Sequence, residues 1–322
     1  MKKINISVVI CCYNSEKLIK DTLRHLAKQR LKSSLSFEVI LVDNNSTDDT
    51  VEVAKKLWQD SRPDIPFNNV EEKKPGLSHA RKTGVLASNG EVIVFCDDDN
   101  WLEVNYLNSA FEIMKTHPEI GALGGQSVGI LETEEPSWWQ SKCLGYAVGK
   151  QALQNGDISK RGFVWGAGLV IPRSILISLY DAGFNSMLSD RKGKILNSGG
   201  DSEICKWILL MGYKLWYSDE LKFTHYIKKE RLTDEYVKNL YDGHYNSQHI
   251  LSIYDWFIKE NIQHFIGNSS LKDKIYFLTK ILKHVYRRNK KWKYYLQVIL
   301  GSTIKVSYPV YYISGTLKNL TS

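Results

Sequence analysis

The sequence contains little cysteine and none of the common cysteine motifs. Its five cysteines are scattered over 322 residues and form no Cys-x-x-Cys pair. This spacing argues against a zinc site and against a disulfide framework, and it suits the reducing cytoplasm. We therefore expect a cytoplasmic protein.

Long hydrophobic runs and glycine-rich phosphate motifs are also missing. No stretch of 18 or more apolar residues occurs, and the N-terminus shows no apolar signal-peptide region, so we expect neither a membrane span nor a leader. No Gly-x-Gly-x-x-Gly follows the first predicted strand, which disfavours an NAD-type dinucleotide fold, and no P-loop motif is present. A bound diphosphate would therefore need a metal ion and side-chain cations.

Positive charge is concentrated near the C-terminus. Residues 261–322 hold eleven Lys or Arg and one acid, a formal charge of +10, whereas residues 1–260 hold 32 bases and 34 acids, a charge of −2. A localised basic segment indicates an anionic partner, such as a membrane surface or nucleic acid. Apolar residues spaced three and four apart within 271–300 predict an amphipathic helix on a membrane surface. The alternative is that this apolar side packs on the rest of the protein.

The hydrophobic pattern predicts alternating strands and helices up to Gly125, and a helical pattern from Thr233 onward. Such alternation implies a mainly parallel sheet with helices on both faces. Asn14-Ser15 and the segment Ser46–Asp49 have the composition of helix caps. The predicted strands cover residues 4–11, 37–42, 69–70, 92–96, 120–125 and 214–217.

Three consecutive carboxylates follow the fourth predicted strand: Asp97, Asp98 and Asp99. Crowded like charges raise the free energy of the ionised forms unless a cation offsets them. Mg²⁺ in proteins typically takes one or two carboxylates together with substrate phosphates. The triplet therefore predicts a divalent metal site, and the alternative is a solvated acidic turn.

Other polar groups follow the first two strands. In open α/β sheets, ligands bind beyond the carboxyl ends of the strands. The candidates there are Cys12, Tyr13, Asn14 and Asp43, which together could hold a base, a ribose and a metal-bound diphosphate. Lys74 and Arg81 supply cations for the diphosphate. Taken alone, Asp43 could be a capping residue and Tyr13 a core residue.

A second acidic cluster reads Gly199-Gly200-Asp201-Ser202-Glu203 at the start of a predicted helix. An aspartate at a helix start is often an N-cap. A carboxylate in a cleft can also act as a general base that takes a proton from a hydroxyl. The sequence leaves both roles open for Asp201.

These motifs occur in a fixed order: Cys12-Tyr13-Asn14, Val42-Asp43-Asn-Asn-Ser46-Thr47-Asp48, Pro75-Gly76-Leu-Ser-His-Ala-Arg81, Phe95-Cys-Asp97-Asp-Asp99 and Gly200-Asp201-Ser-Glu203. The ordered set resembles family 2 glycosyltransferases of the GT-A fold. The resemblance is colinear from about Ile4 to Thr233, more than two thirds of the chain.

The resemblance implies an α/β GT-A fold, Rossmann-like, with a mainly parallel sheet, flanking helices and a helical C-terminal extension. The GT-A domain would cover 1–232, with a nucleotide-sugar-binding half (1–125) and an acceptor-side half (126–232). Residues 233–322 would form the basic extension. The implied activity is inverting transfer of a sugar from a nucleotide-diphosphate donor, with a UDP-sugar favoured, to a glycan or lipid-linked hydroxyl acceptor. Bacterial surface polysaccharide (O-antigen or capsule) assembly is the implied setting.

The family motifs also imply residue roles. Asp43 would hold the nucleobase and Tyr13 would pack on the nucleotide. Asp97 would lie near the ribose, Asp99 would bind the metal, and Asp201 would be the catalytic base. The remaining donor contacts implied are Cys12, Asn14, Lys74, Gly76, Arg81, Asp98 and Arg231, and the implied ligands of Mn²⁺ or Mg²⁺ are Asp97, Asp99 and His225.

Two positions depart from the family pattern. Gly200 stands where many relatives have a glutamate before the base, which removes a supporting carboxylate. Lys82 follows Arg81 where many relatives have an asparagine, which removes an amide.

Two other classes of function remain as alternatives. A metal-dependent nucleotidyl- or phosphotransferase could use a similar sheet, but the missing glycine-rich phosphate loop counts against it. A nucleic-acid-binding protein would explain the basic segment and would leave the aspartate clusters unexplained. We expect no nucleic-acid partner.

Overall fold

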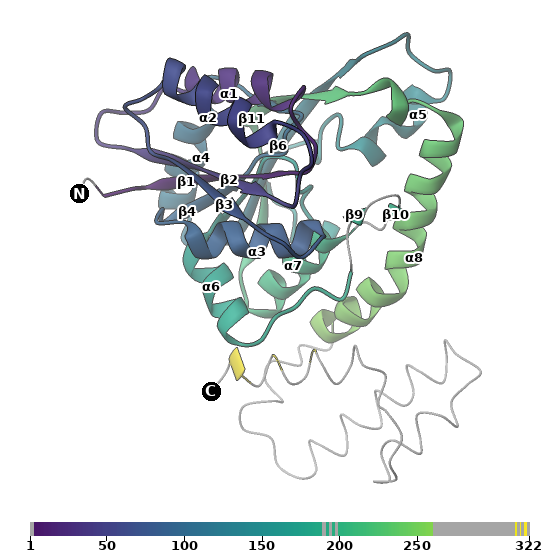
Figure 1. Cartoon of the computed structure of the whole chain (residues 1–322). Coiled ribbons are helices and arrows are strands. Elements are labelled where there is room, and N and C mark those ends of the chain that lie inside the picture. The colour runs from purple at the N-terminus through teal and green to yellow at the C-terminus, as the bar shows by residue number, and fades with distance from the viewer. Residues whose placement is uncertain are drawn as a thin grey trace.

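The structure is a computed structural model that describes residues 3–188, 191–192, 195–196, 199–259, 313, 316 and 319–320. Within these residues, a mixed sheet with the strand order β3-β2-β1-β4-β8-β6-β11-β5 forms the centre of the fold (Figure 1), and β7 pairs with β11 at its side. Two further short strands, β9 and β10, form a separate antiparallel pair. The α/β fold expected from the sequence is confirmed.

The strands are β1 (Ile6–Cys12), β2 (Phe37–Asp43), β3 (Phe67–Glu71), β4 (Val92–Phe95), β5 (Asn100–Leu102), β6 (Ile120–Leu131), β7 (Gly156–Asp157), β8 (Leu169–Pro172), β9 (Arg191–Lys192), β10 (Ile195–Leu196) and β11 (Lys214–Ile227). The helices are α1 (Ile19–Ala27), α2 (Thr50–Ser61), α3 (Leu77–Ala87), α4 (Tyr106–Thr116), α5 (Trp139–Lys142), α6 (Arg173–Asp181), α7 (Gly200–Leu210) and α8 (Asp234–Lys259). Short 3-10 turns lie at Cys143–Tyr146, Ser159–Arg161 and Lys229–Arg231.

The first four strands are parallel, and their register aligns the ends where ligand groups were expected. Cys12 at the end of β1 pairs with Asp43 at the end of β2, and β4 lies on the other side of β1. Parallel strands covered on both faces are continuously apolar, as the buried runs of β1, β2 and β4 are. The motifs that follow these strands therefore meet at one edge of the sheet.

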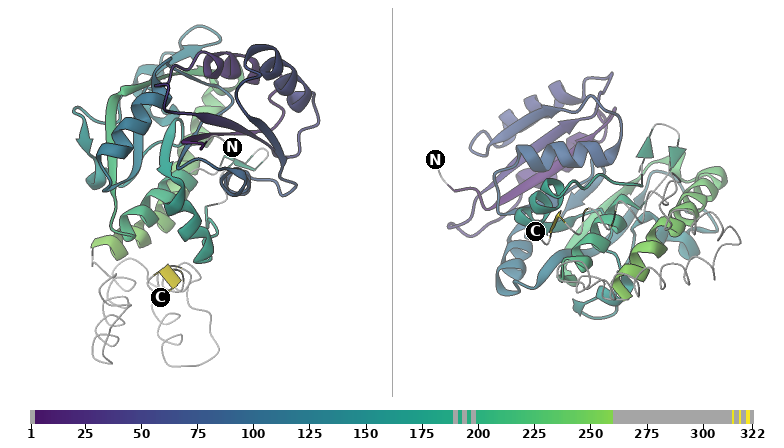
Figure 2. Two further views of the ribbon diagram at one scale, coloured as in Figure 1. Left: turned by 90° about the vertical axis from the view of Figure 1, so that its left-hand side faces the viewer. Right: turned by 90° about the horizontal axis from the view of Figure 1, so that it is seen from below.

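Two hydrophobic cores lie on opposite faces of the sheet. Alternate residues of β1 divide between them: Val8 and Ile10 pack with α1, α2 and α4, whereas Val9 packs with α3, α6 and α7. Figure 2 shows the same division from below, with the purple helices α1 and α2 on one side of the strands and the blue helix α3 on the other. Each face of the sheet is therefore covered, as expected for a doubly wound α/β fold.

The long strands β6 and β11 extend further than the sequence predicted. They pair in parallel, with irregular register near Gly124 and Tyr217, and continue to Leu131 and Ile227. The glycines of Gly124–Gly125 and the polar segment 218–220 have the composition of turns, which is why the sequence predicted shorter strands. The extension carries β11 to β5, so that His225 pairs with Asn100.

The residues predicted to cap α1 and α2 have a different role. Neither helix has a side-chain cap hydrogen bond, and the N-cap positions are Leu18 and Asp49. The predicted capping residues instead link the loops after β1 and β2: the backbone N–H of Thr47 donates to Asn14 Oδ1 (2.8 Å), and the N–H of Asn14 donates to Ser46 Oγ (3.0 Å). The predicted side-chain caps are therefore absent at both N-cap positions, although Asp48 accepts a hydrogen bond from the N–H of Thr50 at the start of α2 (3.2 Å). Asn14 and Ser46 instead fix one loop against the other.

The C-terminal helix α8 packs against α7. Tyr254 donates a hydrogen bond to Glu203 Oε1 (2.6 Å), and Trp207 Nε1 donates to Tyr254 Oη (3.0 Å). Near the end of the chain, Ile313 is fully buried in the same core, and Asn319 Nδ2 donates to the carbonyl of Ala182 (3.1 Å).

The segment 271–300, predicted to form a basic amphipathic helix, lies outside the described residues. No helix in the described part of the chain has the length and apolar composition needed to span a bilayer.

Candidate active site

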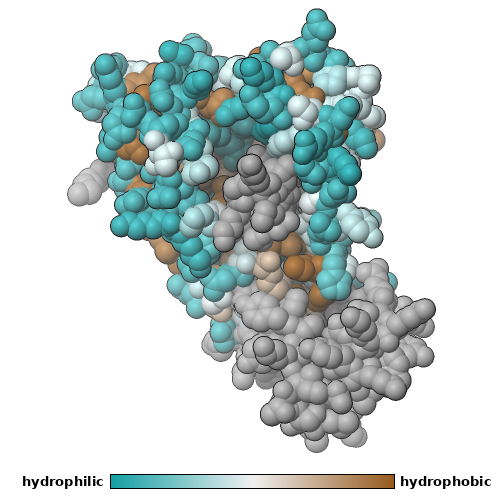
Figure 3. Space-filling view, turned by 45° about the vertical axis from the view of Figure 1, so that its right-hand side comes forward, coloured by the Kyte–Doolittle hydropathy of each residue, from teal (hydrophilic) through white to brown (hydrophobic). Residues whose placement is uncertain are grey.

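The carboxyl ends of β1, β2 and β4 lie at one edge of the sheet, and the chain continues from β4 through Asp97–Asp99 into β5, which pairs with β11. Figure 3 shows a hollow on the molecular surface between walls that are mainly hydrophilic. In open α/β sheets, ligands bind beyond the carboxyl ends of the strands. The motifs that follow β1, β2 and β4 lie at this edge.

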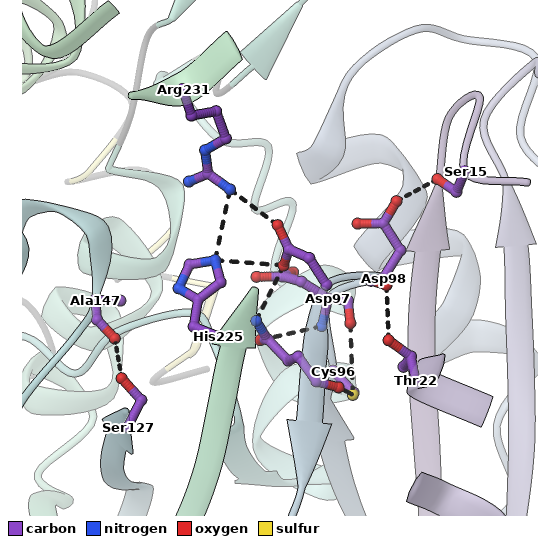
Figure 4. A network of polar contacts seen from close by, with 11 residues as sticks. Ser15, Thr22, Cys96, Asp97, Asp98, Ser127, Ala147, His225 and Arg231 are labelled. Carbon is purple, nitrogen blue, oxygen red and sulfur yellow. Dashed lines mark hydrogen bonds and ion pairs between the residues drawn. The ribbon is translucent and has the colours of Figure 1, made fainter. Parts of the chain in front are cut away.

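The aspartates of the triplet have different partners, and Figure 4 shows Asp98 beside Ser15 and Thr22, on the opposite side from His225 and Arg231. Asp98 faces α1: its carboxylate accepts a short hydrogen bond from Ser15 Oγ, and its carbonyl accepts one from Thr22 Oγ1 (2.6 Å). Burial, with the neighbouring charge of Asp99 as a second cause, raises the pKa of Asp98 to about 7. The structure therefore places Asp98, expected among the donor contacts, against α1.

Asp99 forms a buried polar cluster with His225 and Arg231. Its Oδ2 lies 2.9 Å from Arg231 Nη1, and its Oδ1 lies 3.4 Å from His225 Nε2. Asp99 and His225 are 7% and 4% exposed, so both are almost withdrawn from water. The Arg231 guanidinium also lies 5.7 Å from the ring centres of Tyr146 and Tyr236. The structure thus brings Asp99, predicted to bind the metal, together with two residues from much later in the chain that were predicted to lie near the metal or the phosphates.

This cluster supplies some of the ligand atoms that a divalent ion needs. A carboxylate oxygen and an imidazole nitrogen face each other, and Mn²⁺ or Mg²⁺ accepts such ligands alongside phosphate oxygens and water. No three His, Cys, Asp or Glu side chains gather into a metal site anywhere in the described ranges. The predicted ligand Asp97 is therefore not brought into a three-ligand group, and Asp99 already shares its charge with Arg231. The residues fit an ion that takes its remaining ligands from substrate.

Asp201 lies in the first turn of α7, and its carboxylate is held by two backbone amides. Gly166 N–H donates to Oδ2 (2.7 Å) and Ser202 N–H donates to Oδ1 (2.7 Å). The N-cap position belongs to Gly199, whose φ of 114° is favourable only for glycine. Asp201 therefore does not cap the helix, and the capping alternative left open by the sequence is not supported.

Arg81 lies beside Asp201, with Gly166 between them. A Cβ atom added to Gly166 would lie 2.6 Å from Arg81 Nη2 and 3.2 Å from Asp201 Oδ2. The Arg81 side chain is 5% exposed, and its guanidinium lies 5.5 Å from the ring centre of Phe95. The sequence assigned Arg81 to the diphosphate, whereas the structure shows it next to the candidate base.

The predicted nucleotide contacts differ in their accessibility. Tyr13 is 59% exposed, which excludes the core alternative and leaves its ring free to stack on a base. Cys12 is buried in the core, so its side chain cannot touch a ligand. Asp43 accepts a hydrogen bond from Ser46 N–H (3.1 Å), and Lys74 is exposed.

Asn44 is a positioning residue that the sequence did not single out. Its Nδ2 donates to the carbonyls of Glu72 (2.7 Å) and Lys74 (2.9 Å), and its Oδ1 accepts from the N–H of Gly76 (2.8 Å). Asn44 thus holds the loop before α3 against the end of β2. The only indication of this role in the sequence is the position of the Asn44 amide directly after Asp43 at the end of β2.

Glu203 is a second residue whose role was missed. Its fully buried carboxylate accepts hydrogen bonds from Ser186 Oγ (2.6 Å), Met187 N–H (3.0 Å) and Tyr254 Oη (2.6 Å). Burial raises its pKa, and these hydrogen bonds lower it in part. Glu203 joins the loop after α6, helix α7, which carries Asp201, and helix α8.

A family model described as glycosyl transferase family 2 matches residues 7–179, which is more than half of the chain. The chain belongs to this family. It is 30% identical over 114 residues to the poly(ribitol-phosphate) beta-N-acetylglucosaminyltransferase TarS of Staphylococcus aureus, a match that covers 35% of this chain and 19% of TarS. It is 31% identical over 108 residues to the glycosyltransferase GlyG of Streptococcus pneumoniae, covering 33% and 34% of the two chains. The matches thus span about a third or less of these relatives.

Solved structures of S. aureus TarS share the fold. The crystal structure of TarS residues 1–349 superposes with a TM-score of 0.55 at 16% identity, covering 99% of this chain and 90% of that one. The structure of the same TarS segment in complex with UDP-GlcNAc gives a TM-score of 0.56 at the same identity. At this identity the likeness establishes the fold alone.

Replacing Gly166 by alanine should separate activity from stability. The added methyl group would displace the flexible end of the Arg81 side chain and press on Cβ and Oδ2 of Asp201, both 3.2 Å away, so the fold should be retained while the geometry of the pair is lost. We expect Gly166→Ala to keep the melting temperature of the parent and to lower the rate of sugar transfer by about 10- to 100-fold. Parallel thermal melts and transfer assays test this, with nucleotide affinity as an internal control. A variant with parental turnover would show that the Arg81–Asp201 arrangement is unimportant.

Proposed function

We propose that this chain is an inverting glycosyltransferase that moves a sugar from a nucleoside-diphosphate donor to a hydroxyl acceptor. The observation that carries the proposal is the buried Asp99–His225–Arg231 cluster, which follows β4 in a chain of family 2 that also holds an oriented carboxylate at Asp201. A UDP-sugar is the favoured donor, because TarS structures with this fold are complexes with UDP and UDP-GlcNAc.

The cluster serves the leaving diphosphate in this proposal. Arg231 places a guanidinium, which carries charge and several donors, where negative charge develops as the bond to the anomeric carbon breaks. His225 adds a ring nitrogen on the same side of Asp99. A divalent ion held by Asp99 and His225 would supply further positive charge as a Lewis acid. The exposed Tyr13 ring supplies a stacking surface for the base.

Asp201 acts on the acceptor in this proposal. Its oxygens are oriented by the N–H groups of Gly166 and Ser202, and the remaining lone pairs can accept the proton of an acceptor hydroxyl. The hydroxyl oxygen then attacks the anomeric carbon, the bond from that carbon to the diphosphate oxygen breaks, and the diphosphate leaves with the electron pair. One in-line displacement inverts the anomeric centre.

Substituting the base should abolish transfer and spare donor binding. Asp201→Asn keeps the size of the side chain and removes its basicity, so we expect transfer to fall by about 10²- to 10⁴-fold with donor affinity nearly unchanged. Asp181→Asn, at the exposed end of α6, is a matched control that should behave like the parent. Product analysis also tests the reaction class, because a glycosyltransferase releases nucleoside diphosphate and a nucleotidyltransferase releases pyrophosphate. Transfer at the parental rate by Asp201→Asn would contradict the base assignment.

The two neighbouring aspartates offer a matched test of the metal proposal. Asp99→Asn removes a charge that faces His225, so we expect it to weaken Mn²⁺-dependent UDP binding at least tenfold. Asp98→Asn replaces a carboxyl of raised pKa that faces Ser15, so we expect nearly parental binding. Calorimetry of UDP with and without Mn²⁺ measures both. An equal loss in the two variants, or none in Asp99→Asn, would contradict a specific metal-binding role for Asp99.

We also propose that the enzyme works in surface polysaccharide assembly while attached to the inner face of the plasma membrane. The support is the charge of +10 in residues 261–322 and the polymer-directed name of TarS. Each base near an anionic leaflet contributes about 1 kcal/mol to binding. Several bases together with an apolar helical side would give reversible attachment.

Charge reversal is a better test of membrane binding than truncation, because Ile313 is buried in the core and a shortened chain would expose that core. The variant Lys280→Glu/Lys283→Glu/Arg287→Glu should lose flotation with anionic vesicles at low salt, whereas the parent should float. Lys55→Glu/Lys56→Glu on the exposed side of α2 is the control and should float. A parent that stays unbound, or a triple variant that still floats, would contradict the membrane proposal.

A further inference from the structure

A pocket lies between α3, α6 and α7, directly beside the turn that carries Asp201. Its volume is about 450 Å³, including the open mouth. The space enclosed by its walls is much smaller than this and suits a small group such as a carboxylate or a phosphate. Gly200, the neighbour of Asp201 in the chain, forms part of the wall.

The wall of this pocket is basic. His79, Arg81 and Lys82 line it from α3, and no carboxylate is among its lining residues. Lys82 Nζ lies 5.3 Å from the ring centre of Tyr180, which places the charge over an apolar floor. The first turns of α3 and α7, both helices of 11 residues, also border it, and their partial positive charges add to those of the side chains. Arg81 also lies beside the Asp201 carboxylate, so Lys82, His79 and the two helix ends are the groups that favour a bound anion.

The polar part of the wall is held in place from behind. Ser186 lines the pocket and donates to the buried Glu203 carboxylate (2.6 Å), which also fixes the N–H of Met187. Glu203 and Asp201 belong to the same helix turn. The pocket and the candidate base therefore have a fixed separation, and the pocket is organised before any ligand arrives.

We propose that this pocket binds a carboxylate or phosphate group carried by a substrate. The inference rests on the proposed function and deepens it, because it assigns a negatively charged group to the transferred sugar or to the acceptor. The diphosphate is accounted for by the Asp99–His225–Arg231 cluster, so the basic pocket serves a second anion. That anion belongs either to the transferred sugar or to the acceptor, since Asp201 lies where the two meet.

The direct test uses inorganic phosphate as the probe. Calorimetric titration of phosphate into the full chain, alone and saturated with UDP and Mg²⁺, should show one site that survives UDP loading. Lys82→Gln should weaken this site at least fivefold and leave UDP affinity unchanged. His79→Gln is a second variant with the same expectation, and Lys56→Gln on exposed α2 should match the parent. Absence of phosphate binding, or equal binding by parent and both pocket variants, overturns the inference.

Two matched probe pairs then identify the source of the anion. If the donor carries it, UDP-glucuronate should bind at least fivefold tighter than UDP-glucose, and Lys82→Gln should remove the difference. If the acceptor carries the anion, glycerol 3-phosphate should accelerate the release of UDP from a UDP-sugar more than glycerol does. The Lys82→Gln variant should not show this difference. If neither probe pair shows a preference for the charged member, the inference is wrong. Failure of UDP to bind at all would instead contradict the proposed function, so the two failures are distinguishable.

Discussion

The antiparallel pairing of β11 with β5 determines the composition of the site. It sets His225 opposite Asn100, the residue after Asp99, and it starts the turn that brings Arg231 back to the same carboxylate. His225 and Arg231, from late in the chain, thereby reach the Asp99 carboxylate, which follows β4. Because Asp99 is almost completely buried, removing its charge from water costs free energy. Contacts with His225 and Arg231 offset this cost only when β11 is paired with β5. The half of the sheet around β1, β2 and β4 and the later half therefore depend on one another through a single strand pair.

Local sequence signals predicted the parallel half of the sheet well. The β-branched runs that became β1, β2 and β4, and the polar residues after them, follow from hydrophobic pattern and from the rule that ligands bind at strand ends. The cluster around Asp99 could be assigned only through family resemblance. No local pattern shows that β11 continues past its polar segment 218–220 to reach β5, since that depends on pairing between distant segments. The roles of Asn44 and Glu203 also depend on contacts between distant segments, so the local sequence did not predict them.

The loops after β1 and β2 show how an equally good local signal can mislead. Short polar side chains favour helix N-caps because they satisfy free backbone N–H groups. At Asn14 and Ser46 the same hydrogen-bonding capacity is used across the two loops. Both uses satisfy the backbone, so composition cannot separate them. The bridging arrangement also fixes the backbone on either side of the exposed Tyr13 ring.

The junction at Glu203 has a consequence for how this chain can be divided or recombined. Its carboxylate is buried between the loop after α6 and Tyr254 of α8, and Lys206 on the same helix pairs with Asp255 (2.5 Å). Removing α8 would take away the Tyr254 hydrogen bond to Glu203 and the Asp255 partner of Lys206, and it would uncover the aromatic side of Trp207. The smallest portable unit of this enzyme therefore includes α8, and a chimera joined before Asp234 would contain the family's motifs without the helix that packs against α7.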